Sequence, residues 1–120
     1  MDSHQRATVA FLCGNMSQTS GRRYSSVYDY SAGIYVSCNY VNNEGNISVY
    51  DYRRGCYLSG RMPSFYDYGL SSYISLTKIN TNTYNIYDYH TGSYITVSCH
   101  SQIINVFDYS IGRTFQYQIS

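Results

Sequence analysis

The chain has 120 residues, of which 12% are charged, and its formal net charge is +1. It contains one lysine and no basic stripe that could neutralise a phosphate backbone, so we expect no nucleic-acid partner. Seventeen tyrosines, no tryptophan and a single glutamate favour strands over helices, and a chain of this length is expected to form one domain.

The N-terminal region is expected to differ from the rest of the chain. Residues 7–13 are mostly apolar and predict an additional strand, so residues 1–24 are interpreted as an N-terminal strand and loop. The apolar run is too short to cross a membrane as a helix, and no signal-peptide cleavage pattern follows it. We therefore expect no membrane partner.

Residues 25–120 carry five copies of one unit. The triplet Tyr-Asp-Tyr occurs four times and Phe-Asp-Tyr once, centred on Asp29, Asp51, Asp67, Asp88 and Asp108. Successive Asp residues are separated by 22, 16, 21 and 20 positions. Two variable residues and usually a glycine follow each triplet, and a second alternating run comes after them. This pattern predicts one β-hairpin per copy.

The turns of these hairpins are expected to have three residues, such as 31–33, in a type I turn followed by a left-handed residue. Gly33, Gly55, Gly92 and Gly112 occupy the left-handed position, where a side chain would clash with the backbone. The third copy has Ser71 there, so its turn is predicted to be strained or to have a different loop.

This turn length sets the predicted register of the first hairpin, in which Asp29 lies opposite Tyr35. The predicted core face holds Tyr28, Tyr30, Ile34, Val36 and Cys38. The opposite face would hold Val27, Asp29, Tyr35 and Ser37.

Five hairpins give about ten antiparallel strands, with almost no helix. An all-β up-and-down barrel is the expected architecture, because closure covers the apolar face and removes exposed edges. A two-sheet sandwich and a β-solenoid are the alternatives. The uneven repeat length argues against the solenoid, whose stacked coils need a nearly constant length.

The tyrosines and aspartates are the candidate ligand-binding residues. Tyrosine rings offer flat apolar faces and Asp accepts hydrogen bonds from hydroxyls, so the ligand is expected to be a carbohydrate or a protein surface. The candidates are Tyr35, Tyr57, Tyr73, Tyr94, Asp29, Asp51, Asp67, Asp88 and Asp108. A structural role for the Asp residues, as acceptors for turn amides, is favoured over ligand binding.

Catalysis, metals and cofactors are not expected. The Asp residues are spread one per hairpin, and the adjacent Cys99 and His100 would point to opposite faces of a strand. The four cysteines, Cys13, Cys38, Cys56 and Cys99, form no C-x-x-C pair, and free thiols are favoured over two disulfides. A non-enzymatic binding domain is therefore expected. A structural or self-assembling repeat protein is the alternative.

The unit of Tyr-Asp, a short turn, Gly and a second strand resembles the Tyr-Asp repeats of bacterial Rhs-type shell proteins, over residues 27–116. In that family two residues separate Asp from Gly, whereas three do so here, namely Tyr30, Ser31 and Ala32 in the first copy. The resemblance implies a strand-turn-strand repeat and no particular function.

Overall fold

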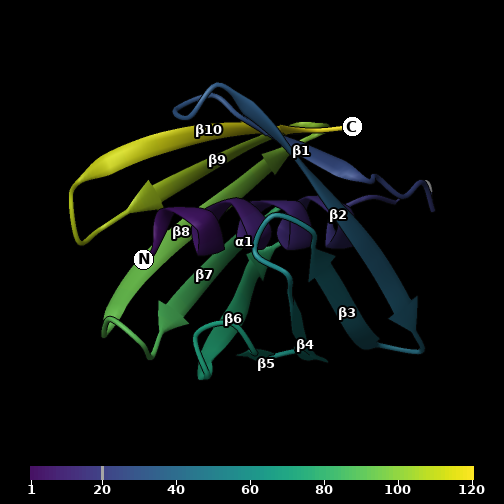
Figure 1. Ribbon diagram of the computed structural model, residues 1–120, viewed down its shortest axis with the longest axis horizontal. Coiled ribbons are helices and arrows are strands. Elements are labelled where there is room, and N and C mark those ends of the chain that lie inside the picture. The colour runs from purple at the N-terminus through teal and green to yellow at the C-terminus, as the bar shows by residue number, and fades with distance from the viewer. Residues whose placement is uncertain (20) are drawn as a thin grey trace.

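The computed structural model describes residues 1–19 and 21–120, and in this part of the chain ten antiparallel strands close into an up-and-down barrel around one helix (Figure 1). The predicted fold class is confirmed, and neither the sandwich nor the solenoid is formed. The elements are α1 (Ser3–Met16), β1 (Ser26–Asp29), β2 (Ile34–Asn43), β3 (Asn46–Asp51), β4 (Cys56–Arg61), β5 (Ser64–Asp67), β6 (Ser72–Asn80), β7 (Thr83–Asp88), β8 (Ser93–His100), β9 (Ile103–Asp108) and β10 (Arg113–Ile119).

Each strand pairs with the next one in the sequence, and β1 pairs with β10 to close the barrel. All five repeat turns therefore lie at one end, which we call the Asp end. The two-residue connections between repeats, such as 44–45 and 62–63, lie at the other end, which we call the mouth. Closure leaves neither β1 nor β10 as a free edge.

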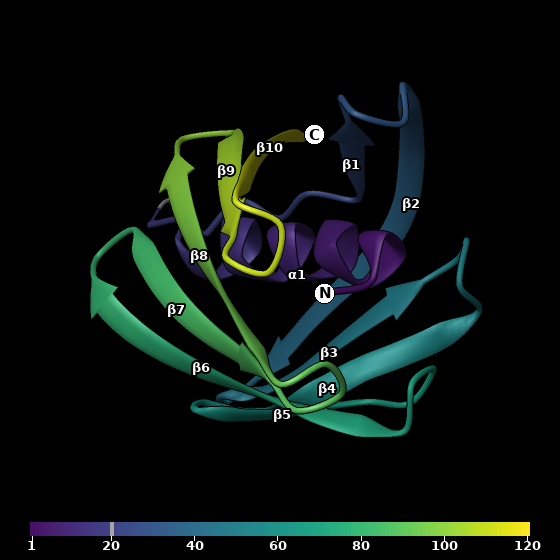
Figure 2. The same cartoon turned by 90° about the vertical axis from the view of Figure 1, so that its left-hand side faces the viewer.

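Residues 7–13 form the middle of α1 and not an additional strand, so this prediction and the expected near absence of helix were wrong. The helix lies inside the ring of strands and runs from the Asp end to the mouth (Figure 2). It shares one hydrophobic core with the barrel, so both form a single unit. Ser20, in the expected N-terminal loop, lies outside the described residues.

The surroundings of α1 explain why its sequence resembles a strand. Every residue from Gln5 to Asn15 is buried, so the helix has no polar face and no amphipathic period. A strand in this position would leave its backbone amides and carbonyls unpaired, whereas a helix pairs its own. Asp2 caps the N-terminus by accepting hydrogen bonds from the backbone N–H groups of His4 and Gln5.

The observed register differs by one residue from the predicted one. Asp29 lies opposite Ile34, Tyr28 opposite Tyr35 and Val27 opposite Val36. Val27 and Asp29 are buried inside the barrel with Val36 and Cys38. The placement of Val36 and Cys38 in the core is confirmed. Ile34 lies on the same face of β2, opposite Asp29, but is 40% exposed at the end of the strand. The inward placement of Tyr28 and Tyr30 and the outward placement of Val27 and Asp29 were wrong.

A longer turn causes this difference. Four residues, 30–33, connect β1 to β2, and the backbone N–H of Gly33 donates to the carbonyl of Asp29 at 2.7 Å. The same bond closes the second, fourth and fifth hairpins, onto Asp51, Asp88 and Asp108. One extra turn residue exchanges the two faces of the first strand of a hairpin relative to the second.

The glycine positions of the turns are confirmed. Gly33, Gly55, Gly92 and Gly112 have φ values of 63° to 68°. Ser71 takes the same left-handed conformation with φ 50°, as the predicted strain in the third turn requires.

We expect Gly92→Val to lower the free energy of unfolding by about 1–3 kcal/mol. A Cβ at Gly92 would meet only the Tyr87 hydroxyl at 3.7 Å, an ordinary contact, so the cost is backbone strain. Ser71→Gly should act in the opposite sense and stabilise by about 0.5–1 kcal/mol, because it relieves the same strain. Thermal melts of both variants test this, and a wild-type melting temperature for Gly92→Val would contradict it.

The four cysteines are free, as predicted. Cys13, Cys38 and Cys99 are buried, and Cys56 is half-buried. Burial, with a smaller effect of Asp51, raises the pKa of the Cys38 thiol to about 12. Cys38 is therefore a neutral part of the core and not a reactive thiolate at neutral pH.

Candidate functional site

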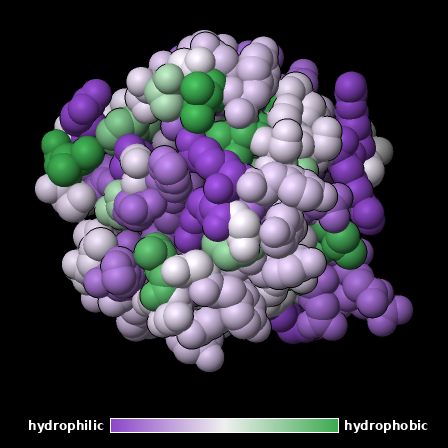
Figure 3. Space-filling model, in the orientation of Figure 1, coloured by the Kyte–Doolittle hydropathy of each residue, from purple (hydrophilic) through white to green (hydrophobic). Residues whose placement is uncertain are grey.

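A belt of exposed tyrosines surrounds the Asp end of the barrel. The belt consists of the outward-facing tyrosines of the repeats, and the candidates Tyr57, Tyr73 and Tyr94 are 50–55% exposed while Tyr35 is 71% exposed. Between these rings the outer face carries serine, threonine, asparagine and glutamine. On the face in Figure 3 most residues have the pale colours of intermediate hydropathy, and hydrophobic residues occur in small separate groups.

Ring contacts hold the belt tyrosines in place. In the first hairpin Tyr28 lies between Tyr30 and Tyr35, with ring centroids 4.8 and 4.7 Å apart. The second, third and fourth hairpins repeat the arrangement around Tyr50, Tyr66 and Tyr87 at 4.7–4.9 Å. Most of these pairs are edge-to-face, which is a favourable geometry for aromatic rings. The exposed rings are therefore ordered before any ligand binds.

Neighbouring hairpins bring exposed tyrosines together in pairs that we call tyrosine slots. A slot lies where the second-strand tyrosine of one hairpin stands beside the last tyrosine of the next triplet. Within the described chain the backbone carbonyls of Tyr57, Tyr73 and Tyr94 accept hydrogen bonds from the N–H groups of Tyr68, Tyr89 and Tyr109, at 3.0, 3.2 and 3.2 Å. These bonds define three slots with the same register.

A hydroxyl side chain lies on the same strand face beside each slot, and in the third slot the Thr96 hydroxyl also contacts the Tyr109 hydroxyl at 3.2 Å. Ser59 lies opposite Tyr66, Ser75 opposite Tyr87 and Thr96 opposite Phe107. The hollow between Tyr57 and Tyr68 has a volume of about 400 Å³ and is also lined by Ser48 and Ser59. The hollow that contains Tyr73 and Tyr89 has a volume of about 580 Å³, and its other lining residues are Ser64, Tyr66, Ser71, Ser72 and Ser75.

The two remaining interfaces between hairpins lack this geometry. The backbone N–H of Tyr52 donates to the carbonyl of Ser37, not to that of Tyr35. The N–H of Tyr30 donates to the carbonyl of Gln116 in the hairpin that has Thr114 in place of the second-strand tyrosine. Tyr35 is thus exposed without a second tyrosine wall.

The five Asp residues face the barrel interior, and each is at most 3% exposed. One carboxylate oxygen of each accepts hydrogen bonds from the turn that follows. Asp29 Oδ1, for example, accepts from the backbone N–H groups of Ser31 and Ala32 at 3.0 and 3.2 Å. Equivalent bonds reach Asp51, Asp67, Asp88 and Asp108 at 2.9–3.1 Å. The Asp residues therefore organise the turns of their own hairpins.

The other carboxylate oxygens of three Asp residues reach the first turns of α1. Thr8 donates its hydroxyl to Asp51 at 2.6 Å, and Gln5 donates its side-chain amide to Asp67 at 2.9 Å. Arg6 and the amino group of Met1 both contact Asp108 at 3.3 Å. These contacts attach the helix to the Asp end.

Charge compensation in this region shifts two pKa values. Burial alone would raise the pKa of Asp108, but hydrogen bonds from Ser110 and the amino group of Met1 outweigh it, so the pKa of Asp108 is lowered. Burial alone would lower the pKa of Arg54, but its hydrogen bonds to Asp67 and the charge of Asp67 raise it above its ordinary value. Asp108 and Arg54 are both charged at neutral pH.

The predicted site residues consequently divide into two sets. The four tyrosines lie on the outer face, whereas the five Asp carboxylates lie on the inner face, so the nine do not form one surface. Sequence reasoning missed Tyr68, Tyr89 and Tyr109, the second walls of the slots. Their constant position as the last residue of each triplet was a signal for them.

No group of three or more His, Cys, Asp or Glu side chains that could hold a metal ion occurs in residues 1–19 and 21–120. In the same described part of the chain, no helix has the length and apolar character needed to span a membrane. Comparison with protein-family models, curated proteins and solved structures finds no match to this chain.

Proposed function

We propose that this protein is a non-enzymatic carbohydrate-binding domain whose contact sites are the three tyrosine slots. The observation that carries the proposal is the combination of two ordered tyrosine walls with a hydroxyl side chain beside them at Ser59, Ser75 or Thr96. A sugar ring presents an apolar face that packs on a tyrosine and hydroxyls that exchange hydrogen bonds with serine or threonine.

The slots also support binding to more than one unit of a glycan. They recur at consecutive hairpin interfaces from β4 to β9, so they lie side by side around the barrel. A single slot of this kind binds one sugar unit weakly. When several slots bind units of the same branched or repeating glycan at once, the overall affinity of the protein for that glycan rises.

A glycan array followed by calorimetry with the best oligosaccharide tests the proposal. We expect the triple variant Tyr57→Ala/Tyr73→Ala/Tyr94→Ala to lose roughly tenfold or more in affinity, because each slot loses one wall. Tyr35→Ala is the control, since it removes a more accessible ring that has no facing tyrosine from the neighbouring hairpin. Its affinity should remain that of the wild type.

Two outcomes would contradict the proposal. An array without a hit would leave a protein surface as the better candidate for a ligand of the tyrosine belt. Equal losses in the triple variant and in Tyr35→Ala would show that the slots have no special role.

Self-assembly through stacked strands remains the alternative function. The closed barrel does not favour it, because β1 and β10 pair with each other and offer no free edge. Sedimentation at increasing concentration tests it: open-ended growth would support assembly, and a concentration-independent monomer would support the soluble binder.

A further inference from the structure

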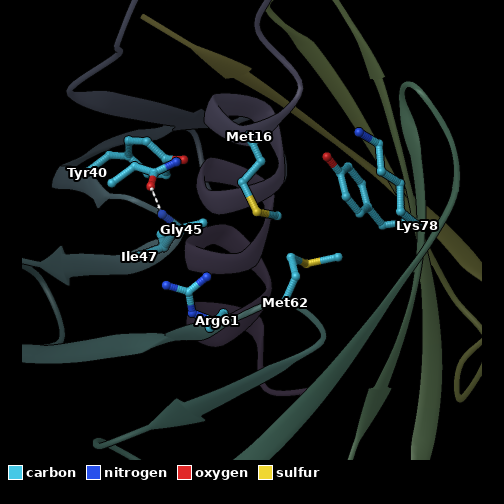
Figure 4. A pocket seen from close by; sticks show the side chains of 9 residues that line it. Met16, Tyr40, Gly45, Ile47, Arg61, Met62 and Lys78 are labelled. Carbon is cyan, nitrogen blue, oxygen red and sulfur yellow. Dashed lines mark hydrogen bonds between the residues drawn. The ribbon is translucent and has the colours of Figure 1, made fainter.

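A separate cavity opens at the mouth of the barrel, at the opposite end from the tyrosine belt (Figure 4). Its volume is about 360 Å³, within the range of small-molecule sites. The cavity is lined by Met16 from the last turn of α1, by Met62 from the turn between β4 and β5, and by Ile47 from β3. These three side chains make much of the lining apolar.

A tyrosine and a lysine on adjacent strands face this cavity. Lys78 of β6 lies directly opposite Tyr84 of β7, so both side chains are on the same inner face of the sheet. Tyr84 is 1% exposed, yet its hydroxyl makes no hydrogen bond within the described part of the chain. The ammonium group of Lys78 has no ion-pair or hydrogen-bond partner among the same residues.

The protonation state of Tyr84 suits a hydrogen-bond donor. Burial raises the pKa of its hydroxyl, with smaller contributions from Cys13 and Cys99, so the hydroxyl keeps its proton at neutral pH. The Tyr84 hydroxyl is not among the fully enclosed unpaired polar atoms of the described residues, so it is accessible from the cavity and can donate to a ligand acceptor. Tyr84 and Lys78 thus present two donors side by side.

The backbone beside this pair is irregular. The register of β6 and β7 shifts between Lys78 and Asn80, and Ile79 is exposed there. A β-bulge of this kind redirects side chains and is common next to binding sites.

The mouth is also electropositive. Within the described chain it carries four cationic side chains, Arg22, Arg23, Arg61 and Lys78, against the single acid Glu44, while the six Asp residues lie at the Asp end. Arg61 donates to the backbone carbonyl of Glu44 at 2.7 Å and has no carboxylate partner among the described residues. In Figure 4 Arg61 and Lys78 lie on opposite sides of the two methionines. This distribution attracts an anion.

The C-terminal dipole of α1 would oppose an anion near Met16, but it is partly compensated. The backbone N–H of Ser17 donates to the carbonyl of Cys13 at 3.0 Å, and the side-chain amide of Gln18 donates to that of Gly14 at 2.9 Å. The carbonyls of Cys13 and Gly14 are therefore occupied by donors.

We propose that the mouth cavity binds a small amphipathic monocarboxylate. Its apolar body packs against Met16, Met62 and Ile47, and its carboxylate accepts hydrogen bonds from the Tyr84 hydroxyl and the Lys78 ammonium group. This site is separate from the tyrosine slots and does not depend on the proposed carbohydrate binding.

Decanoate is a suitable probe, and the three methionines report where it binds. In a protein with labelled methionine methyl groups, we expect saturable shifts of the Met16 and Met62 signals on addition of decanoate. Met1 is an internal control, because its amino group contacts Asp108 at the Asp end. Substitution of each methionine by leucine assigns the signals.

Calorimetry with variants tests the anion contacts. Lys78→Met keeps most of the length of the unbranched side chain and removes the charge, and it should weaken decanoate binding roughly tenfold. Tyr84→Phe should weaken it by a smaller factor. Arg113→Gln removes one positive charge at the Asp end and should leave the affinity unchanged. Thermal melts check that each variant is folded.

Three results would overturn the proposal. One is the absence of saturable shifts at Met16 and Met62, or equal shifts at all three methionines. Another is that decanol binds the wild-type protein as tightly as decanoate does. The last is that Arg113→Gln weakens binding as much as Lys78→Met, which would indicate a general charge effect.

Discussion

Replacing Asp67 by alanine is expected to lower the free energy of unfolding by about 3–5 kcal/mol. Arg54 donates to both carboxylate oxygens of Asp67, at 2.7 and 2.8 Å, and Gln5 of α1 donates at 2.9 Å. The carboxylate also accepts the backbone N–H groups of Gly69 and Leu70. Its removal leaves Arg54, a largely buried cation, without its counterion, and leaves the third turn without its acceptor. Chemical denaturation measures this loss.

Asp88 supplies the matched control. It is equally buried and accepts hydrogen bonds from the His90 backbone and the Thr91 hydroxyl, but it has no ion pair within the described residues. Asp88→Ala should therefore cost less, about 1–3 kcal/mol, which is the penalty for unpaired polar groups. Asp67→Asn should fall between wild type and Asp67→Ala, since an acceptor for the turn amides remains. Unchanged stability in both alanine variants would contradict the structural role of these residues.

Phe11→Ala is expected to lower the free energy of unfolding by about 3–5 kcal/mol. Phe11 is fully buried on the helix at the centre of the barrel, among inward-facing aliphatic side chains. Removing its ring leaves a cavity that the strands cannot fill, because their spacing is fixed by the closed hydrogen-bond network. Denaturant titration gives the free energy directly.

Tyr52→Ala is the control for loss of an aromatic ring. Tyr52 is exposed on the outer face and makes an edge contact with Tyr50 at 4.9 Å. We expect a loss of about 1 kcal/mol, as for a single aromatic pair. If Phe11→Ala were no more destabilising than Tyr52→Ala, the helix would not be an essential part of the core.

Short-range chemistry made much of the barrel predictable. Alternation of apolar and polar residues over a few positions defines a strand wherever one face is buried. The left-handed conformations of Gly33, Gly55, Gly92 and Gly112 follow from the absence of a side chain, which is a local property. The role of the Asp residues as acceptors for turn amides is equally local, because donor and acceptor are two or three positions apart.

The register was not predictable from the same patterns. The predicted three-residue turn and the observed four-residue turn both place a glycine in the left-handed position. They differ in whether the last tyrosine of the triplet belongs to the strand or to the turn. The bond from the Gly33 backbone to the carbonyl of Asp29 includes Tyr30 in the turn. That single residue turns the Asp carboxylates inward and the tyrosines outward, which separates the two sets of candidate residues.

Tertiary structure also decided the conformation of residues 7–13 and the location of both proposed sites. An apolar segment without hydrophobic periodicity fits a buried strand or a buried helix. The surrounding barrel favours the helix, because a helix forms all its backbone hydrogen bonds within itself. Its fit is close: a Cβ at Gly14 would come within 2.8 Å of Ile119 Cδ1. The slots join residues from different repeats, such as Tyr57 and Tyr68, and the mouth cavity joins Met16 of α1 with Lys78 of β6. The sequence by itself determined the repeated hairpin and its turn chemistry, because these depend on neighbours along the chain. Closure of the barrel around α1 determined which side chains meet.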